Sequence, residues 1–189
     1  MGEPVAIDPV AARLLLGVAR AAIEARVLGR PEPPLPGHPP AIRRPRGAFV
    51  TLRSGGDLRG CIGVVEPRDP LVEAVAHCAV AAATEDPRFP PVTESELPDI
   101  HLEVSVLDRP FRVDGPGRIE PGRHGVIVSR GAYRGLLLPQ VAIEHGWDAA
   151  TLLEQCCRKA GLPADAWRRG GVVIEAFEAQ VFSEPEAEG

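Results

Sequence analysis

The sequence predicts a protein that combines α-helices with antiparallel β-hairpins. Two pairs of β-prone segments are each joined by a short turn containing glycine, and strands joined in this way pair antiparallel. Other segments carry apolar residues at helical spacing. With 189 residues, 44% of them hydrophobic, the chain is long enough for a substantial core. We expect a single domain over residues 1–189, with room for a small subdomain leaning on it.

The composition disfavours several classes of protein. No apolar run approaches the roughly 20 residues needed to span a bilayer, so we do not expect a membrane protein. The N-terminus lacks the basic region and apolar block of a signal peptide, and a cytoplasmic location follows by default. A formal net charge of -5 gives no general attraction to nucleic acid or anionic lipid.

The four cysteines show neither the paired spacing of a zinc site nor the framework of a disulfide-stapled secreted domain. They are Cys61, Cys78, Cys156 and Cys157. We therefore expect reduced thiols in a reducing compartment. The chain also lacks the phosphate-loop, dinucleotide-binding, nucleophile-elbow and zinc-protease motifs. No cofactor and no metal is predicted.

The first predicted element is an amphipathic helix. Asp8 supplies an N-cap acceptor, Pro9 suits the first helical position, and apolar residues then recur at helical spacing as far as Ala25. The prolines between Gly29 and Pro45 forbid helix or central strand, so we expect a stiff surface connection. Three arginines at its end could bind phosphate, although a solvated loop is the commoner explanation. They are Arg43, Arg44 and Arg46.

The first predicted hairpin joins Ala48–Arg53 to Leu58–Val65 through a turn with two glycines. Its return strand carries the segment Leu58-Arg59-Gly60-Cys61-Ile62-Gly63. Because side chains alternate along a strand, Arg59 and Cys61 project from the same face.

That segment allows two interpretations. A nearby positive charge favours the thiolate, the reactive form of cysteine, so Arg59 could activate Cys61. Gly60 and Gly63 leave room for a ligand or another backbone to come close. The alternative is that Cys61 is a small apolar residue packed in a sheet and that the glycines mark a bulge.

The next predicted helix opens at Asp69 and Pro70, which repeat the pattern of cap and proline, and extends to about Thr84. Its many alanines allow close packing, so we expect it to be largely buried. His77 and Cys78 lie about 100° apart on it and cannot both point squarely at one metal. Positions in the core or at its boundary are the simpler expectation for both.

Strands resume after an irregular segment. In His101–Leu107 apolar and polar residues alternate, and Glu103 on the polar face could act as an acid or base or bind a ligand, or could be a solvated carboxylate. A second hairpin joins Gly125–Ser129 to Arg134–Leu138. His124 stands at its mouth, where loop ends present side chains to clefts; its alternative role is to cap a turn.

The chain ends with a helix and a strand. Asp148 caps a helix over Ala149–Ala160 whose cysteines are most simply core thiols, and Gly161 stops it. Gly171–Phe182 alternates as a final strand. The acidic residues 183–189 should form a frayed tail.

The segment Leu58–Gly63 resembles the hallmark of the AMMECR-type domain, whose prokaryotic members are called AmmeMemoRadiSam system protein A. Further segments agree with the family in order and spacing, and the resemblance covers nearly the whole chain. They are Asp86–Pro91, Glu96–Pro98, Glu103–Leu107, His124–Gly125, Leu138–Val141, Gly146–Asp148 and Lys159–Leu162.

The resemblance implies an α+β fold with a mainly antiparallel sheet, packed helices and a smaller subdomain. The name of the prokaryotic system implies that such proteins are encoded beside a Memo-like protein and a radical S-adenosylmethionine enzyme. This chain lacks the three-cysteine cluster of a radical enzyme, so it would be a partner of that enzyme. Genetic association names no reaction, and no catalytic role is carried over from the family.

Two functions therefore stay open. In the first, the protein is an enzyme or enzyme component in which Cys61 is a nucleophile or thiol carrier, Arg59 activates it or holds an anionic group, and His124 handles protons. In the second, the glycine-flanked segment is a docking groove for a peptide or a protein partner. Nucleic-acid binding through the arginine cluster is the least favoured, given the acidic total charge.

Overall fold

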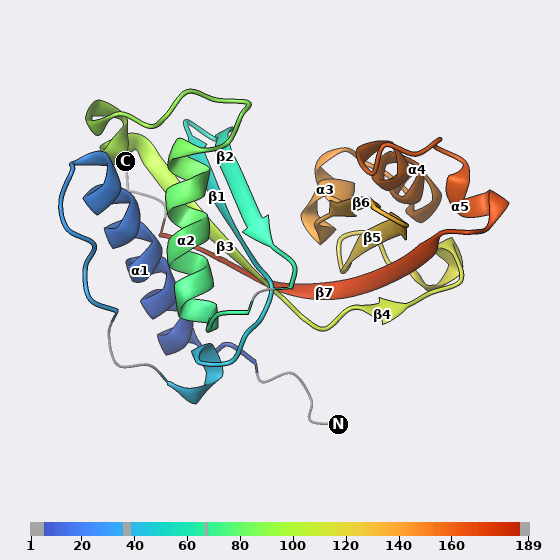
Figure 1. Cartoon of the computed structure of the whole chain (residues 1–189), viewed down its shortest axis with the longest axis horizontal. Helices are drawn as coiled ribbons and strands as arrows, with labels where there is room; N and C mark the ends of the chain where they lie inside the picture. Colours follow the sequence, from blue (N-terminus) through green and yellow to red (C-terminus); the bar gives the residue numbers. More distant parts are fainter. Residues whose placement is uncertain (1–5, 36–38, 67, 186–189) are drawn as a thin grey trace. The chain divides into compact units, whose positions relative to one another are not determined.

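The computed structural model describes residues 6–35, 39–66 and 68–185. The chain divides into two compact units, and each is described by itself. The first unit comprises Met1–Leu107 together with Gln180–Gly189, and the second comprises Asp108–Ala179. Helices are combined with antiparallel strand pairs in both (Figure 1), which confirms the predicted α+β fold.

The sheet of the first unit is built on β1 (Ala48–Ser54), which pairs antiparallel with β2 (Asp57–Val64) on one side and with β3 (Ile100–Leu107) on the other. The C-terminal end of β7 (Val173–Ser183) follows β3 in the strand order, so β2 is an edge strand. The predicted hairpin is confirmed, and both glycines of its turn have positive φ, as a tight hairpin turn requires.

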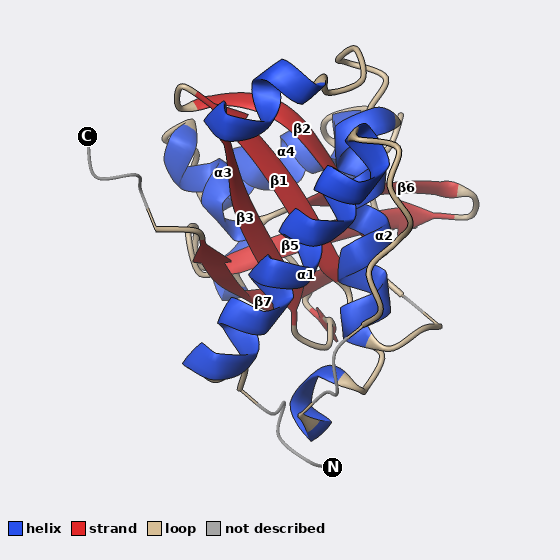
Figure 2. Cartoon of the chain, turned by 90° about the vertical axis from the view of Figure 1, so that its left-hand side faces the viewer, coloured by secondary structure: helices blue, strands red, loops and turns tan. Residues whose placement is uncertain are grey.

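Helices α1 (Pro9–Val27) and α2 (Leu71–Thr84) lie side by side over one face of this sheet (Figures 1 and 2). The Asp8 carboxylate accepts hydrogen bonds from two backbone N–H groups of the first turn of α1, as predicted. The predicted cap of α2 is wrong. Pro70 occupies the N-cap position of α2, and no side chain caps it, because the helix begins one residue later than the pattern suggested.

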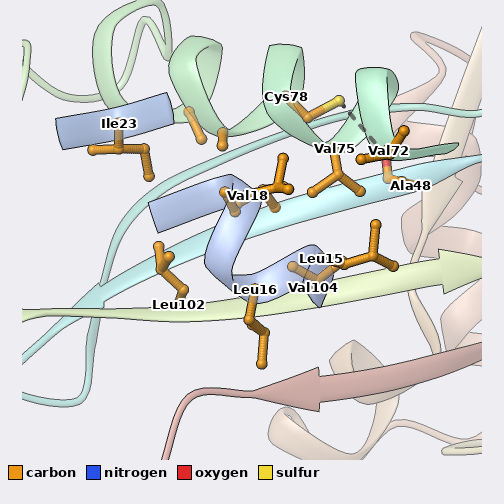
Figure 3. Close-up of a cluster of buried hydrophobic side chains, with 14 of the residues drawn as sticks. Leu15, Leu16, Val18, Ile23, Ala48, Val72, Val75, Cys78, Leu102 and Val104 are labelled. Carbon is orange, nitrogen blue, oxygen red and sulfur yellow. Dashed lines mark hydrogen bonds between the residues drawn. The ribbon is translucent and has the colours of Figure 1, made fainter. Parts of the chain in front are cut away.

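The core of the first unit lies between this helical layer and the sheet. Figure 3 shows side chains of α1 and α2 converging on β1 and β3, with Leu15, Val75 and Val104 fully buried. The Cys78 thiol donates to the Ala48 carbonyl at 3.9 Å, and Cys78 is therefore a core residue, as expected. His77, its neighbour on α2, is exposed, so the core or boundary position expected for it is wrong.

The second unit has its own sheet and core. Its strand β5 (His124–Arg130) pairs antiparallel with β6 (Tyr133–Leu137) and with the first part of β7, which confirms the second hairpin. Helix α4 (Ala149–Lys159) packs on β5 and β6, and its two cysteines are fully buried. Asp148 caps it as predicted.

Several short elements were not predicted, because elements of two to six residues carry too few periods to show a pattern. They are β4 (Phe111–Arg112), α3 (Pro139–Glu144), α5 (Ala166–Arg169), and the 3-10 helices η1 (Pro40–Ile42), η2 (Glu94–Asp99) and η3 (Pro116–Arg118).

The C-terminal segment is held to the first unit by an ion pair. Arg20 of α1 binds both carboxylate oxygens of Glu184 and also donates to the carbonyl of Ile100 at 2.7 Å. The Glu184 carboxylate also accepts from the backbone N–H of Leu102 at 2.9 Å, and the Glu184 N–H donates to the Leu102 carbonyl at 3.0 Å. Of the predicted tail, residues 186–189 lie outside the described residues.

Among the described residues, no helix combines the length and the apolar composition that crossing a bilayer requires.

The packing of α2 on the sheet predicts opposite effects of alanine at two glycines. A Cβ at Gly60 would lie 2.2 Å from the Ala82 carbonyl oxygen, whereas a Cβ at Gly17 of α1 would meet nothing within 4 Å. Gly60→Ala should lower the free energy of unfolding by about 1–3 kcal/mol through overpacking. Gly17→Ala should raise it by roughly 0.5–1 kcal/mol through helix propensity. Urea denaturation measures both, and a neutral Gly60→Ala would contradict the close approach of α2.

Candidate functional site

Cys61 lies on the edge strand β2, on the face of the sheet that is turned away from α1 and α2. Its neighbour Gly60 faces α2, since a Cβ there would collide with the Ala82 carbonyl. Side chains alternate along a strand, so Cys61, the next residue, projects from the opposite face. The register with β1 shifts at Arg59, which is the extra residue of a bulge between Leu58 and Gly60. Alternation is interrupted there, and the shared face of Arg59 and Cys61 stays a prediction. Both are partly buried.

The free edge of β2 is covered at Cys61 by two side chains from the segment after α2. The Cys61 N–H donates to the Asp86 carboxylate at 2.9 Å, and Arg88 Nη2 donates to the Cys61 carbonyl at 3.4 Å. These are the backbone groups that an added strand would use. Strand addition by a peptide is therefore blocked at this residue.

Asp86 is the most buried member of this arrangement, with 4% of its surface exposed. Its carboxylate also accepts from the Arg88 guanidinium at 2.6 and 2.9 Å and from the Arg88 backbone N–H at 3.1 Å. The Arg88 side chain and then the backbone N–H of Cys61 hold the pKa of this carboxyl well below its usual range, against the opposing effect of burial. Asp86 is therefore an anion throughout the physiological pH range.

A second ion pair holds Arg59. Its Nε and Nη2 donate to the two carboxylate oxygens of Glu96 at 2.8 and 3.2 Å. Glu96 is fixed in turn by the backbone N–H and the hydroxyl of Thr93, in the capping box of η2. The Arg59 hydrogen bond, followed by that of the Thr93 backbone, lowers the pKa of Glu96 to about 2. The remaining guanidinium nitrogen, Arg59 Nη1, is buried and has no hydrogen-bond partner among the described residues.

An aromatic ring links the two ion pairs. The guanidinium carbons of Arg59 and Arg88 lie 6.0 and 5.4 Å from the centroid of the Phe89 ring, within the range of cation–π attraction. Segments 58–63, 86–91 and 93–98 thus assemble into one site. We call it the Cys61 cluster, and it consists of Thr51, Arg59, Cys61, Asp86, Arg88, Phe89 and Glu96.

Cys61 is the least buried of the four cysteines. Thr51 of β1, its cross-strand neighbour, donates a hydroxyl hydrogen bond to Cys61 Sγ at 3.3 Å. The other three cysteines are buried. Burial raises the pKa of Cys78 to about 11 and that of Cys156 to about 12, and it raises the pKa of Cys157 as well. Those three thiols are held in the unreactive protonated form.

The charges of the Cys61 cluster are balanced in pairs. The sequence suggested Arg59 as a cation acting on the thiol, but Arg59 is paired with Glu96 and Arg88 with Asp86. Two positive charges therefore face two negative ones. Arg59 is distinguished by its Nη1 donor, which is buried and is not used by the ion pair with Glu96.

The two glycines of the segment are occupied by the chain itself. Gly60 admits the backbone of α2, and a Cβ at Gly63 would lie 2.2 Å from the ring of Phe49 on β1. The contacts at Gly60 therefore favour a close approach by another backbone, that of α2, over a close approach by a ligand.

Glu103 belongs to the same row of side chains as the thiol. On β3 it is paired in register with Thr51, which is paired with Cys61 on the other side. Two strand spacings, about 10 Å, therefore separate Glu103 from Cys61. A direct hydrogen bond between them is too long at that separation.

His124 belongs to the second unit, where it opens β5. It is 6% exposed, and its Nδ1 accepts from the backbone N–H of Glu120 at 3.0 Å. Its Nε2 lies 3.8 Å from the carboxylate of Glu178, and its ring meets Phe111 edge to face. These contacts favour the turn-capping alternative for His124.

Sequence reasoning gave no role to Asp86, Arg88, Phe89, Glu96 or Thr51. The available signal was the edge strand itself, since an edge that carries a functional segment must be covered by something. The sequence alone did not show which residues cover it. Residues 6–35, 39–66 and 68–185 contain no group of three or more His, Cys, Asp or Glu side chains placed to hold a metal ion.

Comparisons with known proteins give a consistent result. The profile of the family described as AMMECR1 matches residues 16–182. A protein of Thermofilum pendens is 48% identical over 197 residues, which cover 93% of this chain and 91% of that protein. Protein MJ0810 of Methanocaldococcus jannaschii is 48% identical over 179 residues, covering 90% of this chain and 89% of that protein.

A solved structure has the same fold. The crystal structure of the uncharacterised protein PH0010 from Pyrococcus horikoshii superposes with a TM-score of 0.88 at 41% sequence identity, covering 94% of this chain and 93% of that chain. This likeness confirms the fold expected from the resemblance.

The ion pair of Arg59 and Glu96 makes a prediction for titration by carbon-detected NMR. Glu96 should titrate at about pH 2, and Arg59→Ala should raise its pKa towards the ordinary value of about 4.3. Because the folded pKa is the lower one, the pair stabilises the fold above pH 4.3 and this contribution is lost as the pH falls towards 2. Arg59→Ala should therefore cost more stability at pH 7 than at pH 2. Arg123→Ala, which breaks an ion pair of the second unit, is the control and should leave Glu96 unchanged.

Proposed function

The chain belongs to the AMMECR1 family, and from that premise we propose that it is an enzyme, or an enzyme component, whose reactive group is the thiol of Cys61. One observation carries the proposal. The sulfur of Cys61, the least buried of the four cysteines, accepts a hydrogen bond from Thr51, and two residues away on β2 Arg59 has a buried donor without a partner among the described residues. A buried donor that the protein leaves unpaired is available to a ligand.

Each group has a role in the proposed chemistry. The thiolate of Cys61 is the nucleophile or the carrier atom, since the thiolate is the reactive form of cysteine. The Thr51 hydroxyl stabilises its charge through the hydrogen bond to sulfur. Arg59 Nη1 donates to an oxygen of the substrate, either a carbonyl or an anionic group. His124 takes no part, because its Nδ1 already accepts the Glu120 N–H.

The alternative, a docking groove for a peptide at the same segment, receives less support. Asp86 and Arg88 occupy the edge groups that an extended peptide would pair with, and Gly60 faces α2. Enlarging Gly60 would therefore disturb the fold before it disturbed any partner. A binding role at this segment would need a partner that recognises side chains on the sheet face.

We extend the proposal to the pathway. The name of the prokaryotic family members links such proteins to a radical S-adenosylmethionine enzyme and a Memo-like protein, and we propose these two as partners. All four cysteines, each within the described ranges, are unbridged, which supports a cytoplasmic location.

The thiol proposal predicts how alkylation depends on Thr51. At pH 7 iodoacetamide should modify Cys61 faster than the three buried cysteines, with the sites identified by peptide mass. Thr51→Val removes the hydroxyl donor at nearly constant volume and should slow the reaction of Cys61 by roughly three- to tenfold, the worth of one hydrogen bond. Above the pKa of the thiol in both proteins the two rates should converge, since ionisation is then complete.

Thr51→Ser is the matched control, because it keeps the hydroxyl and should preserve most of the rate. If Cys61 is as inert as Cys78 until the protein unfolds, it is a packing residue and the proposal fails.

The pathway proposal predicts physical association. When the chain is co-expressed with the radical enzyme and the Memo-like protein of its source organism, affinity purification should recover at least one of them. Cys61→Ser should leave this association intact, because the thiol is assigned to chemistry and not to docking. Recovery of neither protein, with each one shown to be folded, would remove the pathway from the proposal.

A further inference from the structure

A second site lies on the opposite side of the first unit. A pocket of about 660 Å³ is formed by α1, α2 and the proline-rich segment 32–35 that follows α1. The volume is within the range of sites for small molecules, roughly 300–1,000 Å³. Helices α1 and α2 cover one face of the sheet (Figure 2), and Cys61 is on the other face. None of the described residues that line the pocket belongs to the Cys61 cluster.

The walls of the pocket are apolar, and the side chains along the helices are small. Leu14 and Val18 of α1 face Ala76 and Val80 of α2 across it, and Leu35 contributes from the proline-rich segment. These side chains form a contiguous apolar lining contributed by three segments. A contiguous open apolar surface is characteristic of a binding site.

A glycine in the wall has no explanation in the packing of the chain. Gly17 lies in the middle of α1, where glycine costs about 1 kcal/mol of helix stability relative to alanine. At Gly60 a Cβ would collide with a neighbour, but at Gly17 it would meet nothing within 4 Å. The space beside Gly17 is the pocket itself.

The charged groups around the pocket have one sign. Glu73 and Glu85 line it from the two ends of α2, Glu32 lines it from the proline-rich segment, and none of the described lining residues is a lysine or an arginine. His77 is the one basic side chain in the lining, and it is exposed. A ligand that fits this lining has an apolar body and a positive charge.

We propose that this pocket binds a small apolar amine, with the alkyl or ring portion between α1 and α2 and the ammonium group beside a carboxylate at one end of the pocket. The pocket volume argues for a small molecule, the apolar walls for its body, and the three carboxylates for its charge. The inference stands apart from the thiol chemistry and does not depend on it.

The experiment compares three probes with the same six-carbon chain. Full-length protein is titrated with n-hexylamine, n-hexanol and n-hexanoate, and binding is followed by amide and methyl NMR shifts. The expected shifts are confined to residues of the pocket such as Val18, Ala76 and Val80. Hexylamine should bind at least about fivefold more tightly than hexanol, which corresponds to one exposed charge interaction of about 1 kcal/mol. Hexanoate should bind most weakly.

Two kinds of variant test the parts of the site separately. Glu73→Gln and Glu85→Gln test the two ends of the pocket. The variant at the end that holds the ammonium group should weaken hexylamine by up to about fivefold, and both should leave hexanol unchanged. Glu24→Gln, on α1 but outside the pocket, is the matched control. Gly17→Leu should fill the pocket and abolish binding of both probes without loss of thermal stability, whereas Gly17→Ala should keep most of the binding.

Each alternative outcome overturns the proposal. Equal affinity for hexylamine and hexanoate means that the carboxylates do not select the ligand. Shifts outside the pocket, undiminished binding to Gly17→Leu, or no binding by any probe mean that the pocket is not the site. Cys61→Ser should bind hexylamine like the parent protein, so failure of the thiol proposal leaves this test intact.

Discussion

The hydrogen bond from the Cys61 backbone to the Asp86 carboxylate is the constraint on which the functional face of this protein depends. An edge strand must have its free N–H and C=O groups covered, and here a carboxylate and a guanidinium from the segment after α2 replace the missing strand. That contact fixes the segment against β2. Phe89 is then brought between Arg88 and Arg59, and the site is complete only when all three segments are in place.

The charged side chains of the Cys61 cluster are stabilised because each carboxylate is paired with a guanidinium. Asp86 is nearly fully buried and would be costly to ionise alone, but its partners satisfy both oxygens. In the pair of Arg59 and Glu96 the guanidinium is the more buried partner, and Glu96 is anchored by a capping box. The charges around the thiol are thus balanced, and the proposed chemistry rests on the Thr51 hydroxyl and on the Arg59 donor that has no partner among the described residues.

The two faces of the sheet in the first unit differ in the side chains that they carry. Gly60 lets α2 approach β2 closely, so one face of the sheet is committed to the core. The other face carries the polar row of Cys61, Thr51 and Glu103. Beyond the core, the outer side of the helical layer keeps an open apolar pocket bordered by carboxylates. The proposed thiol site and the proposed amine pocket therefore lie on opposite sides of the same layer of sheet and helices.

The sequence by itself determined the elements whose cause is local. Asp8 and Pro9 start α1, glycines with positive φ close the first hairpin, and strand periodicity puts Gly60 and Cys61 on opposite faces. The tertiary structure determined which groups the residues of β2 contact. Asp86 and Glu96 are 25 and 37 residues from their partners on β2, and no local period records such a contact. The N-cap of α2 was predicted wrongly as Asp69, because the pattern of a capping residue followed by proline does not fix the first residue of the helix to within one position.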